Sequence, residues 1–121
     1  MGISSFRELR VWQAGMDLVE QIYRLTEMFP PKEIYGLVAQ MRRAAVSIPS
    51  NIAEGHTREH SKEYLHHLSM AHASLAELQT QLEIAHRLHF LASDQASVMG
   101  EQTASLSRQL YALRNALLKR G

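Results

Sequence analysis

Apolar residues recur at steps of three and four positions along most of the chain, which is the spacing of one face of an α-helix. The first stretch carries two such rows side by side, and together they form an apolar arc wider than a two-helix contact requires. One row consists of Val11, Gly15, Leu18, Ile22, Leu25 and Phe29, and the row beside it of Trp12, Met16, Val19, Tyr23 and Thr26.

The first predicted helix has two candidate starting points. Ser5 and Glu8 have the spacing of a capping box, which favours a start directly after Ser5. A start near Leu9 is the alternative. Pro30 and Pro31 end this helix, because proline lacks the N–H group that a helix interior needs.

A second apolar row predicts a helix that takes its start from Pro31, since proline is favoured in the first helical turn. Pro49 lies inside this row, yet the residues on both sides of it keep one helical phase. We therefore predict a single helix, kinked at Pro49 and running to Glu54, with Gly55 as its left-handed cap. The row consists of Ile34, Leu37 or Val38, Met41, Ala45, Ile48 and Ile52.

The proline inside this helix has a local cost. Pro49 cannot donate a hydrogen bond to the carbonyl of Ala45, and a proline in a helix interior costs about 3 kcal/mol. Ser47, Ser50 and Asn51 lie near enough to bond exposed backbone groups and reduce that cost. The alternative is one helix that ends at Ser47 and another that begins at Ser50 or Asn51.

Two further helices complete the pattern. The third is predicted to begin near Ser61 as its N-cap, and the fourth at Ser93 and Asp94. The third row consists of Leu65, Leu68, Ala71 or His72, Leu75, Leu78, Leu82, Ala85 and His89. The fourth consists of Met99, Leu106, Leu110, Leu113 and Leu117. Four long helices with short connections predict an all-α, up-down-up-down antiparallel four-helix bundle, formed as a single domain over residues 1–121.

Composition agrees with this class of fold. The chain has 121 residues, 45% of them hydrophobic, and a formal net charge of +1, which by itself indicates no polyanionic partner. It has no cysteine, which excludes disulfides, thiolate metal sites and cysteine nucleophiles. No apolar run approaches the roughly 18 residues of a membrane span, and no secretory signal pattern is present. We expect a soluble cytoplasmic protein with no membrane partner.

Glutamate and histidine residues at the spacing of di-iron proteins occur twice, as Glu63-x-x-His66 and Glu83-x-x-His86. That metal site needs the two elements on facing helices, whereas here both lie on the third predicted helix, about 30 Å apart. His60 and His67 are interpreted as residues of a solvated face. With no glycine-rich phosphate loop and no nucleophile on a sharp turn, we expect no metal, no cofactor and no catalytic residue.

A polar row flanks the apolar face of the second helix and a similar row lies on the third. Arg43 of the one and Glu77 of the other are predicted to pair across the bundle and set the helix register. The alternative is that each rests at a wet boundary. The two rows consist of Gln40, Arg43, Ser47, Asn51 and Glu54, and of Ser74, Glu77 and Gln81.

The end of the fourth helix is basic. After Glu101, the last acidic residue, come Arg108, Arg114, Lys119 and Arg120. Basic residues complement the negative end of a helix dipole, which is the simple explanation. The alternative is a phosphate-binding patch, whose affinity would multiply if several chains presented it together.

Several segments resemble a known family. They are LRVWQ (9–13), IYRLTEMFP (22–30), YGL (35–37), QMRRAAVSIPSNIAEG (40–55) and SLAELQTQ (74–81). Together they resemble the four-helix-bundle proteins encoded in intervening sequences of bacterial 23S ribosomal RNA genes. They are also similar to the accessory variability proteins of diversity-generating retroelements.

This resemblance implies a four-helix bundle that assembles as a homopentamer, and a family with no established enzyme activity. The retroelement relatives bind nucleic acid and a reverse transcriptase through basic surfaces. We expect a non-enzymatic, self-assembling bundle that acts as a scaffold or adaptor, with further copies of itself as partners. The alternative is a module that binds RNA, or a nucleic-acid-associated protein, through Arg108, Arg114, Lys119 and Arg120. The expected subunit interface consists of Trp12, Met16, Val19 and Tyr23, for which ordinary core packing is the alternative.

Overall fold

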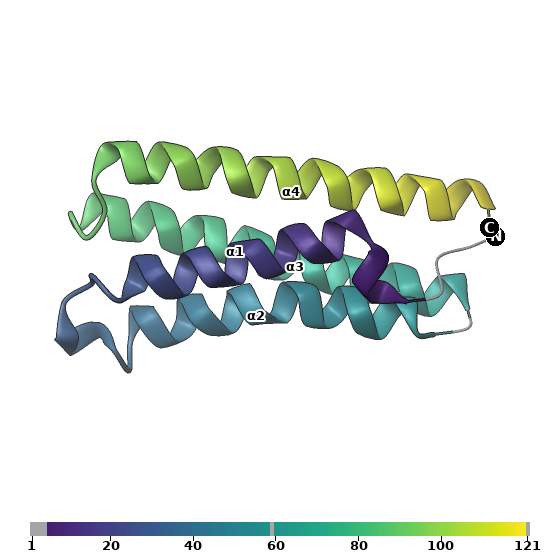
Figure 1. Cartoon of the computed structure of the whole chain (residues 1–121), viewed down its shortest axis with the longest axis horizontal. Coiled ribbons are helices and arrows are strands. Elements are labelled where there is room, and N and C mark those ends of the chain that lie inside the picture. The colour runs from purple at the N-terminus through teal and green to yellow at the C-terminus, as the bar shows by residue number, and fades with distance from the viewer. Residues whose placement is uncertain (1–4, 59, 121) are drawn as a thin grey trace.

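The computed structural model describes residues 5–58 and 60–120. Its four α-helices run along the long axis of the molecule (Figure 1). Two single turns of 3₁₀ helix, η1 and η2, lie before the first and second of them. The elements are η1 (Phe6–Glu8), α1 (Arg10–Thr26), η2 (Pro31–Glu33), α2 (Leu37–His56), α3 (Ser61–Arg87) and α4 (Ser93–Arg120).

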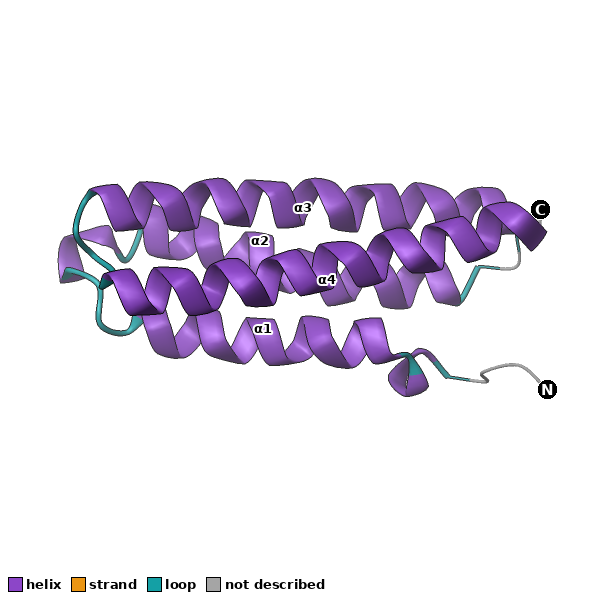
Figure 2. Ribbon diagram, turned by 90° about the horizontal axis from the view of Figure 1, so that it is seen from above, coloured by secondary structure: helices purple, strands orange, loops and turns teal. Residues whose placement is uncertain are grey.

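Successive α-helices run in opposite directions, as Figures 1 and 2 both show. The predicted all-α fold of four helices with antiparallel neighbours is therefore confirmed. The most extensive packing is between α2 and α3, and α1 packs more closely against α2 than against α4. The start of α1, the end of α2, the start of α3 and the end of α4 meet at one end of the molecule (Figure 1).

The core is built from the predicted apolar rows. Helical spacing brings one face of each helix inward, so that these side chains leave water together. Thr103 fills the gap in the α4 row, and its hydroxyl, buried among apolar groups, donates to the Met99 carbonyl at 2.8 Å. The largest fully buried side chains are those of Leu18, Ile22, Met41, Ile48, Ile52, Leu68, Leu75, Leu78, Leu110 and Thr103.

The start of the first helix combines the two alternatives. Ser5 and Glu8 do form a capping box, but it caps the 3₁₀ turn η1, and α1 itself begins at Arg10. The later start is therefore the correct one for the α-helix. Likewise Pro31 opens the turn η2, and α2 begins only at Leu37, which leaves Ile34 exposed and outside the core.

Helix α2 passes through Pro49 without a break, so the alternative of two helices is wrong. Ser50 Oγ donates to the Val46 carbonyl at 2.8 Å, and Asn51 Nδ2 donates to the Ser47 carbonyl at 2.9 Å. Pro49 is buried against α1 at Gly15, where an added Cβ would lie 3.4 Å from Pro49 Cβ. The proline thus packs closely against α1, while the Ser50 and Asn51 side chains bond carbonyls of the preceding turn other than that of Ala45.

Three predicted ends and row positions are wrong. Gly55 is no left-handed cap: it lies inside α2, which runs to His56, and no glycine of the described residues has a positive φ. Ser61 is the first residue of α3 and not its N-cap, a position that His60 occupies without a side-chain bond. His89 lies beyond α3, exposed, with a φ of 64°.

Within the described residues, no helix is both long enough and apolar enough to cross a membrane.

Candidate functional site

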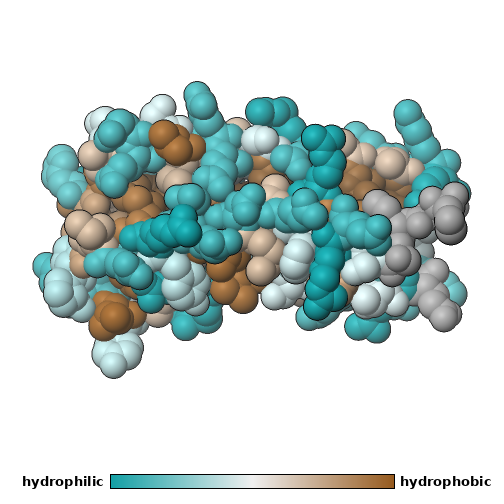
Figure 3. Space-filling view, in the orientation of Figure 1, coloured by the Kyte–Doolittle hydropathy of each residue, from teal (hydrophilic) through white to brown (hydrophobic). Residues whose placement is uncertain are grey.

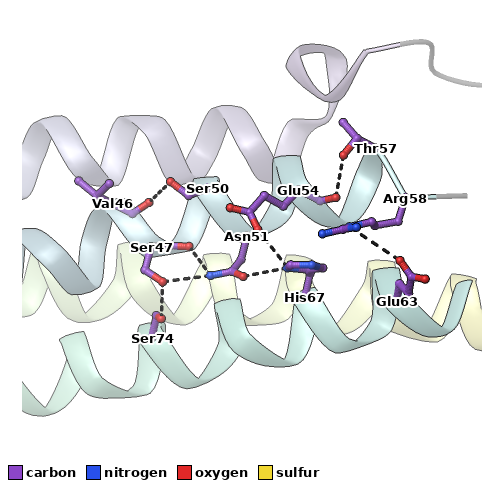
Figure 4. Close-up of polar contacts among 10 residues, drawn as sticks. All are labelled: Val46, Ser47, Ser50, Asn51, Glu54, Thr57, Arg58, Glu63, His67 and Ser74. Atoms are coloured by element: carbon purple, nitrogen blue, oxygen red, sulfur yellow. Dashed lines mark hydrogen bonds and ion pairs between the residues drawn. The ribbon is translucent and has the colours of Figure 1, made fainter. Parts of the chain in front are cut away.

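A chain of polar side chains joins α2 to α3, and we call it the polar ladder: Ser47, Asn51 and Glu54 from α2, with His67 and Ser74 from α3 (Figure 4). Ser74 Oγ donates to Ser47 Oγ at 2.9 Å, and Asn51 Nδ2 donates to the same oxygen at 3.0 Å. His67 Nδ1 lies 3.0 Å from Asn51 Oδ1 and 3.7 Å from a Glu54 oxygen.

The ladder assigns a proton to the histidine. Because Asn51 Nδ2 donates to Ser47, its Oδ1 is the acceptor that faces His67, and His67 Nδ1 must carry the hydrogen. Asn51 is buried, so its amide has lost water and needs these partners. The ladder therefore holds α2 and α3 in one register, which is a structural role.

The prediction that His67 belongs to a solvated face is wrong. Its side chain is only 12% exposed, whereas His60 is exposed as expected. The signal was available: His67 precedes Ser74 by seven residues, which is two helical turns, and so continues the predicted polar row of α3.

Arg43 and Glu77 line the same hollow between α2 and α3, beside Gln40 and the Ser47–Ser74 bond. They form no ion pair within 4.0 Å. Instead, Glu77 Oε2 accepts a hydrogen bond from Gln81 Nε2 on its own helix at 3.3 Å. The polar ladder, rather than a pair between these two charges, connects the helices.

The second apolar row of α1 is only partly covered. Trp12 is half-buried, with Phe6 at 5.3 Å between ring centroids, and Val19 is half-buried too. Met16 is 38% exposed and Tyr23 is 41% exposed, so neither is an ordinary core residue. The Arg42 guanidinium lies over the Tyr23 ring, with Cζ 4.5 Å from the ring centroid. Arg42 Nε also donates to the hydroxyl of the buried Thr26 at 3.0 Å.

Next to Tyr23, a shallow groove continues the exposed apolar surface onto the turn between η2 and α2 and onto α2 itself. Ile34, Tyr35 and Val46 line it, and all three are exposed. Figure 3 shows hydrophobic side chains reaching the surface of this molecule between hydrophilic ones. The second row of α1 and this groove together form what we call the apolar face of the α1–α2 pair.

The four basic residues of α4 are all exposed, but they do not share one face. At 100° per residue, Arg108, Arg114 and Lys119 fall within one broad arc of the helix, whereas Arg120 points to the other side. Burial raises the pKa of Tyr64, and the positive charge of Arg120 offsets part of this increase.

In the middle of that arc lies Tyr111, a residue that the sequence did not single out. Tyr111 is 52% exposed, and its ring packs on His72 of α3, with 4.1 Å between ring centroids and 44° between ring planes. His72 Nε2 lies 3.5 Å from Ser107 Oγ. Burial lowers the pKa of His72, Arg114 lowers it further, and a hydrogen bond with Ser107 offsets part of the change.

The two Glu-x-x-His elements lie on α3 as predicted. Both glutamates pair with arginines: Glu63 Oε2 lies 3.8 Å from Arg58 Nε, and Glu83 Oε2 lies 2.9 Å from Arg87 Nε. Across the described residues, no group of three or more His, Cys, Asp and Glu side chains is placed to hold a metal ion.

These features define an all-α four-helix protein whose adjacent helices pack antiparallel and whose buried polar groups hold helices together. Residues 7–112 match the family described as 23S rRNA-intervening sequence protein, and the chain belongs to this family. The resemblance to that family is therefore confirmed, while the relation to retroelement accessory proteins stays a prediction.

A solved structure shares the fold. It is a protein of unknown function from the S23 ribosomal protein family of Bacteroides thetaiotaomicron VPI-5482, with a TM-score of 0.81 and 17% sequence identity. The match covers 87% of this chain and 95% of the other. No curated protein matches the chain.

Proposed function

We propose that this protein is a non-enzymatic helical bundle that assembles with copies of itself and acts as a scaffold or adaptor. The observation that carries the proposal is the exposure of Met16 and Tyr23 on the apolar face of the α1–α2 pair. Contiguous apolar surface of this kind marks interaction sites in soluble proteins.

The composition of this face suits a subunit contact. Tyr23 and Arg42 stack on each other at its centre, and Trp12 lies along the same row. Tyrosine, tryptophan and arginine are the residue types that dominate binding energy at interfaces. In a cyclic ring each copy offers this face to a different patch of the next copy, so the assembly closes.

A homopentamer is the assembly that we propose, and it rests on the family and on the resemblance to retroelement accessory proteins. Size-exclusion chromatography with light scattering tests it directly. The wild-type chain should show about five times the 13.7 kDa of one subunit. A single 13.7 kDa species at high concentration would contradict the proposal.

A matched pair of variants locates the interface. Met16→Lys combined with Tyr23→Glu should yield the single subunit, because each charge would have to be buried in the contact. Met70→Lys on α3 is the control, since Met70 is 42% exposed and lies outside the proposed face. Equal behaviour of the two variants would show that the contact lies elsewhere.

Nucleic-acid binding is the second candidate. The supporting observation is the exposed arc formed by Arg108, Arg114 and Lys119. All three follow Glu101, which is the last acidic residue of α4. Lys62 adds a positive charge in the first turn of α3, which lies at the same end of the bundle as the end of α4 (Figure 1). Several copies in a ring would present the arc repeatedly, which raises the affinity for a long polyanion.

Gel shifts with structured RNA at increasing salt test this candidate. Replacement of Arg108, Arg114 and Lys119 by Gln should weaken binding and flatten its salt dependence, because fewer counterions are released. Arg87→Gln, at the opposite end of the bundle, is the control. Unchanged binding by the triple variant would refute the assignment of this surface.

A further inference from the structure

We propose that Tyr111 is a stacking platform for an unpaired base of single-stranded nucleic acid, with Arg108 and Arg114 contacting the neighbouring phosphates. The inference rests on the second candidate function, and it assigns to that surface a defined ligand class. Three observations carry it: an exposed aromatic ring, a second ring that supports it, and flanking cations without carboxylate partners.

The exposed ring is the first observation. Tyr111 is 52% exposed although tyrosine is a large, mostly apolar side chain, and it does not fill a core position. One part of the ring packs on His72 at 4.1 Å between centroids, which leaves the rest to solvent. A base laid on the open part would stack on the tyrosine ring, as bases do on aromatic side chains of single-strand-binding proteins.

The supporting ring is held in place. His72 is half-buried between α3 and α4, with Nε2 at 3.5 Å from Ser107 Oγ. Burial and Arg114 both lower the pKa of His72, so its imidazole is neutral at pH 7 and packs as an uncharged ring. The positive charge next to the ring therefore comes from Arg108 and Arg114 and not from His72.

The flanking cations are the third observation. Arg108 and Arg114 lie three residues before and after Tyr111, so both are its neighbours on the helix surface. Both are exposed, and neither lies within 4.0 Å of a carboxylate of the described residues. The α3 residues one or two turns from His72 on this side are uncharged: Leu65, Ser69 and Ala76. Lys119 continues the arc of positive charge along α4.

Stacking on one aromatic ring and contacts from two arginines to phosphates do not distinguish one base from another. The site therefore fits an unpaired nucleotide of any sequence, and a paired base cannot reach the ring because its faces are covered in the duplex.

Fluorescence anisotropy of a labelled polyuridine strand, with one 2-aminopurine in it, tests the proposal on the full chain. Tyr111→Ala should weaken binding about 5- to 150-fold, which corresponds to the roughly 1–3 kcal/mol of one stacked base. It should leave the salt slope unchanged and abolish the change in 2-aminopurine emission. Tyr111→Phe should retain both, and Leu88→Ala, at an exposed residue directly after α3 and outside the apolar face, is the control.

The outcomes separate the two ideas. If the Arg108, Arg114 and Lys119 variant loses binding while Tyr111→Ala does not, the basic surface stands and the stacking platform is overturned. If neither variant changes binding, both are overturned.

Two further measurements test the ligand class. The isolated mononucleotide should bind far more weakly than the strand, and duplex RNA no more tightly than single strands after correction for charge. Equal binding of mononucleotide and strand, or tighter binding of duplex, overturns the proposal. Light scattering of Tyr111→Ala completes the test, because a changed subunit number would assign Tyr111 to a contact between copies instead.

Discussion

Gly55 lies where the end of α2 passes very close to the start of α3. A Cβ atom at this position would lie 2.9 Å from both His67 Cβ and Tyr64 Cδ1, closer than two such carbons can approach. Gly55→Ala should therefore lower the free energy of unfolding by about 1–3 kcal/mol, the usual cost of overpacking. Urea unfolding followed by circular dichroism measures the change.

Gly100 is the matched control for that substitution. It also lies inside a helix, α4, but a Cβ there would meet nothing within 4 Å. Gly100→Ala should stabilise the protein by about 0.5–1 kcal/mol, because alanine has the higher helix propensity. If both variants lost stability, the loss in Gly55→Ala could not be attributed to the close approach of α3 at Gly55.

His72 makes stability depend on pH. Its folded-state pKa lies below the ordinary 6.5, so between these two values the unfolded chain binds more protons than the folded chain. The free energy of unfolding should therefore fall as pH drops through 6.5 and level off below the folded-state pKa. Melting temperatures of wild type and His72→Gln against pH test this, since the variant should lose that part of the slope.

At the scale of the helices, the polar ladder is the feature that determines how α2 and α3 pair. Asn51→Ala would leave His67 Nδ1 without its short-range acceptor and would remove the amide from the Ser47 hydroxyl. The expected loss is about 1–3 kcal/mol, because partly buried donors and acceptors lose their partners. Urea unfolding is again the measurement.

Ser50→Ala is the control for the ladder. Ser50 also bonds its own helix, at Val46, but it is exposed and makes no bond to α3. The change should stay within about 0.5 kcal/mol, as for most surface substitutions. Similar losses in Asn51→Ala and Ser50→Ala would contradict the role of the ladder between helices.

At the scale of the whole molecule, the two proposed interactions differ in their response to salt. Contact through the apolar face of the α1–α2 pair should persist when salt is raised, because burial of apolar surface is not screened. Nucleic-acid binding through the arc of Arg108, Arg114 and Lys119 should fall steeply over the same range. Light scattering and anisotropy on one salt series measure both. Dissociation of the assembly by salt would place charged groups, rather than Met16 and Tyr23, at its centre.

Local sequence determined the helices. The rows of apolar residues predicted four of them, and the unbroken phase around Pro49 predicted the continuity of α2, because helical periodicity is a property of neighbouring residues. The capping box at Ser5 was likewise local and correct, although it caps η1. The boundaries at Gly55 and Ser61 were predicted wrongly. Glycine occurs both as a cap and inside a helix, serine occurs both as an N-cap and as the first helical residue, and local preference does not choose between these positions.

What the sequence left open depends on distance in space. Gly55 is needed because α3 passes close to it, and His67 is buried because Asn51 lies sixteen residues away along the chain and opposite it in the bundle. Arg43 and Glu77 were predicted to meet, yet they only share a hollow, because side-chain reach across a groove depends on helix separation. The pairing of Tyr111 with His72 joins two helices in the same way.

Sequence by itself determined which residues form helices and which faces turn inward. Only the tertiary structure decided which polar and aromatic groups meet, because those distances depend on how the finished helices pack.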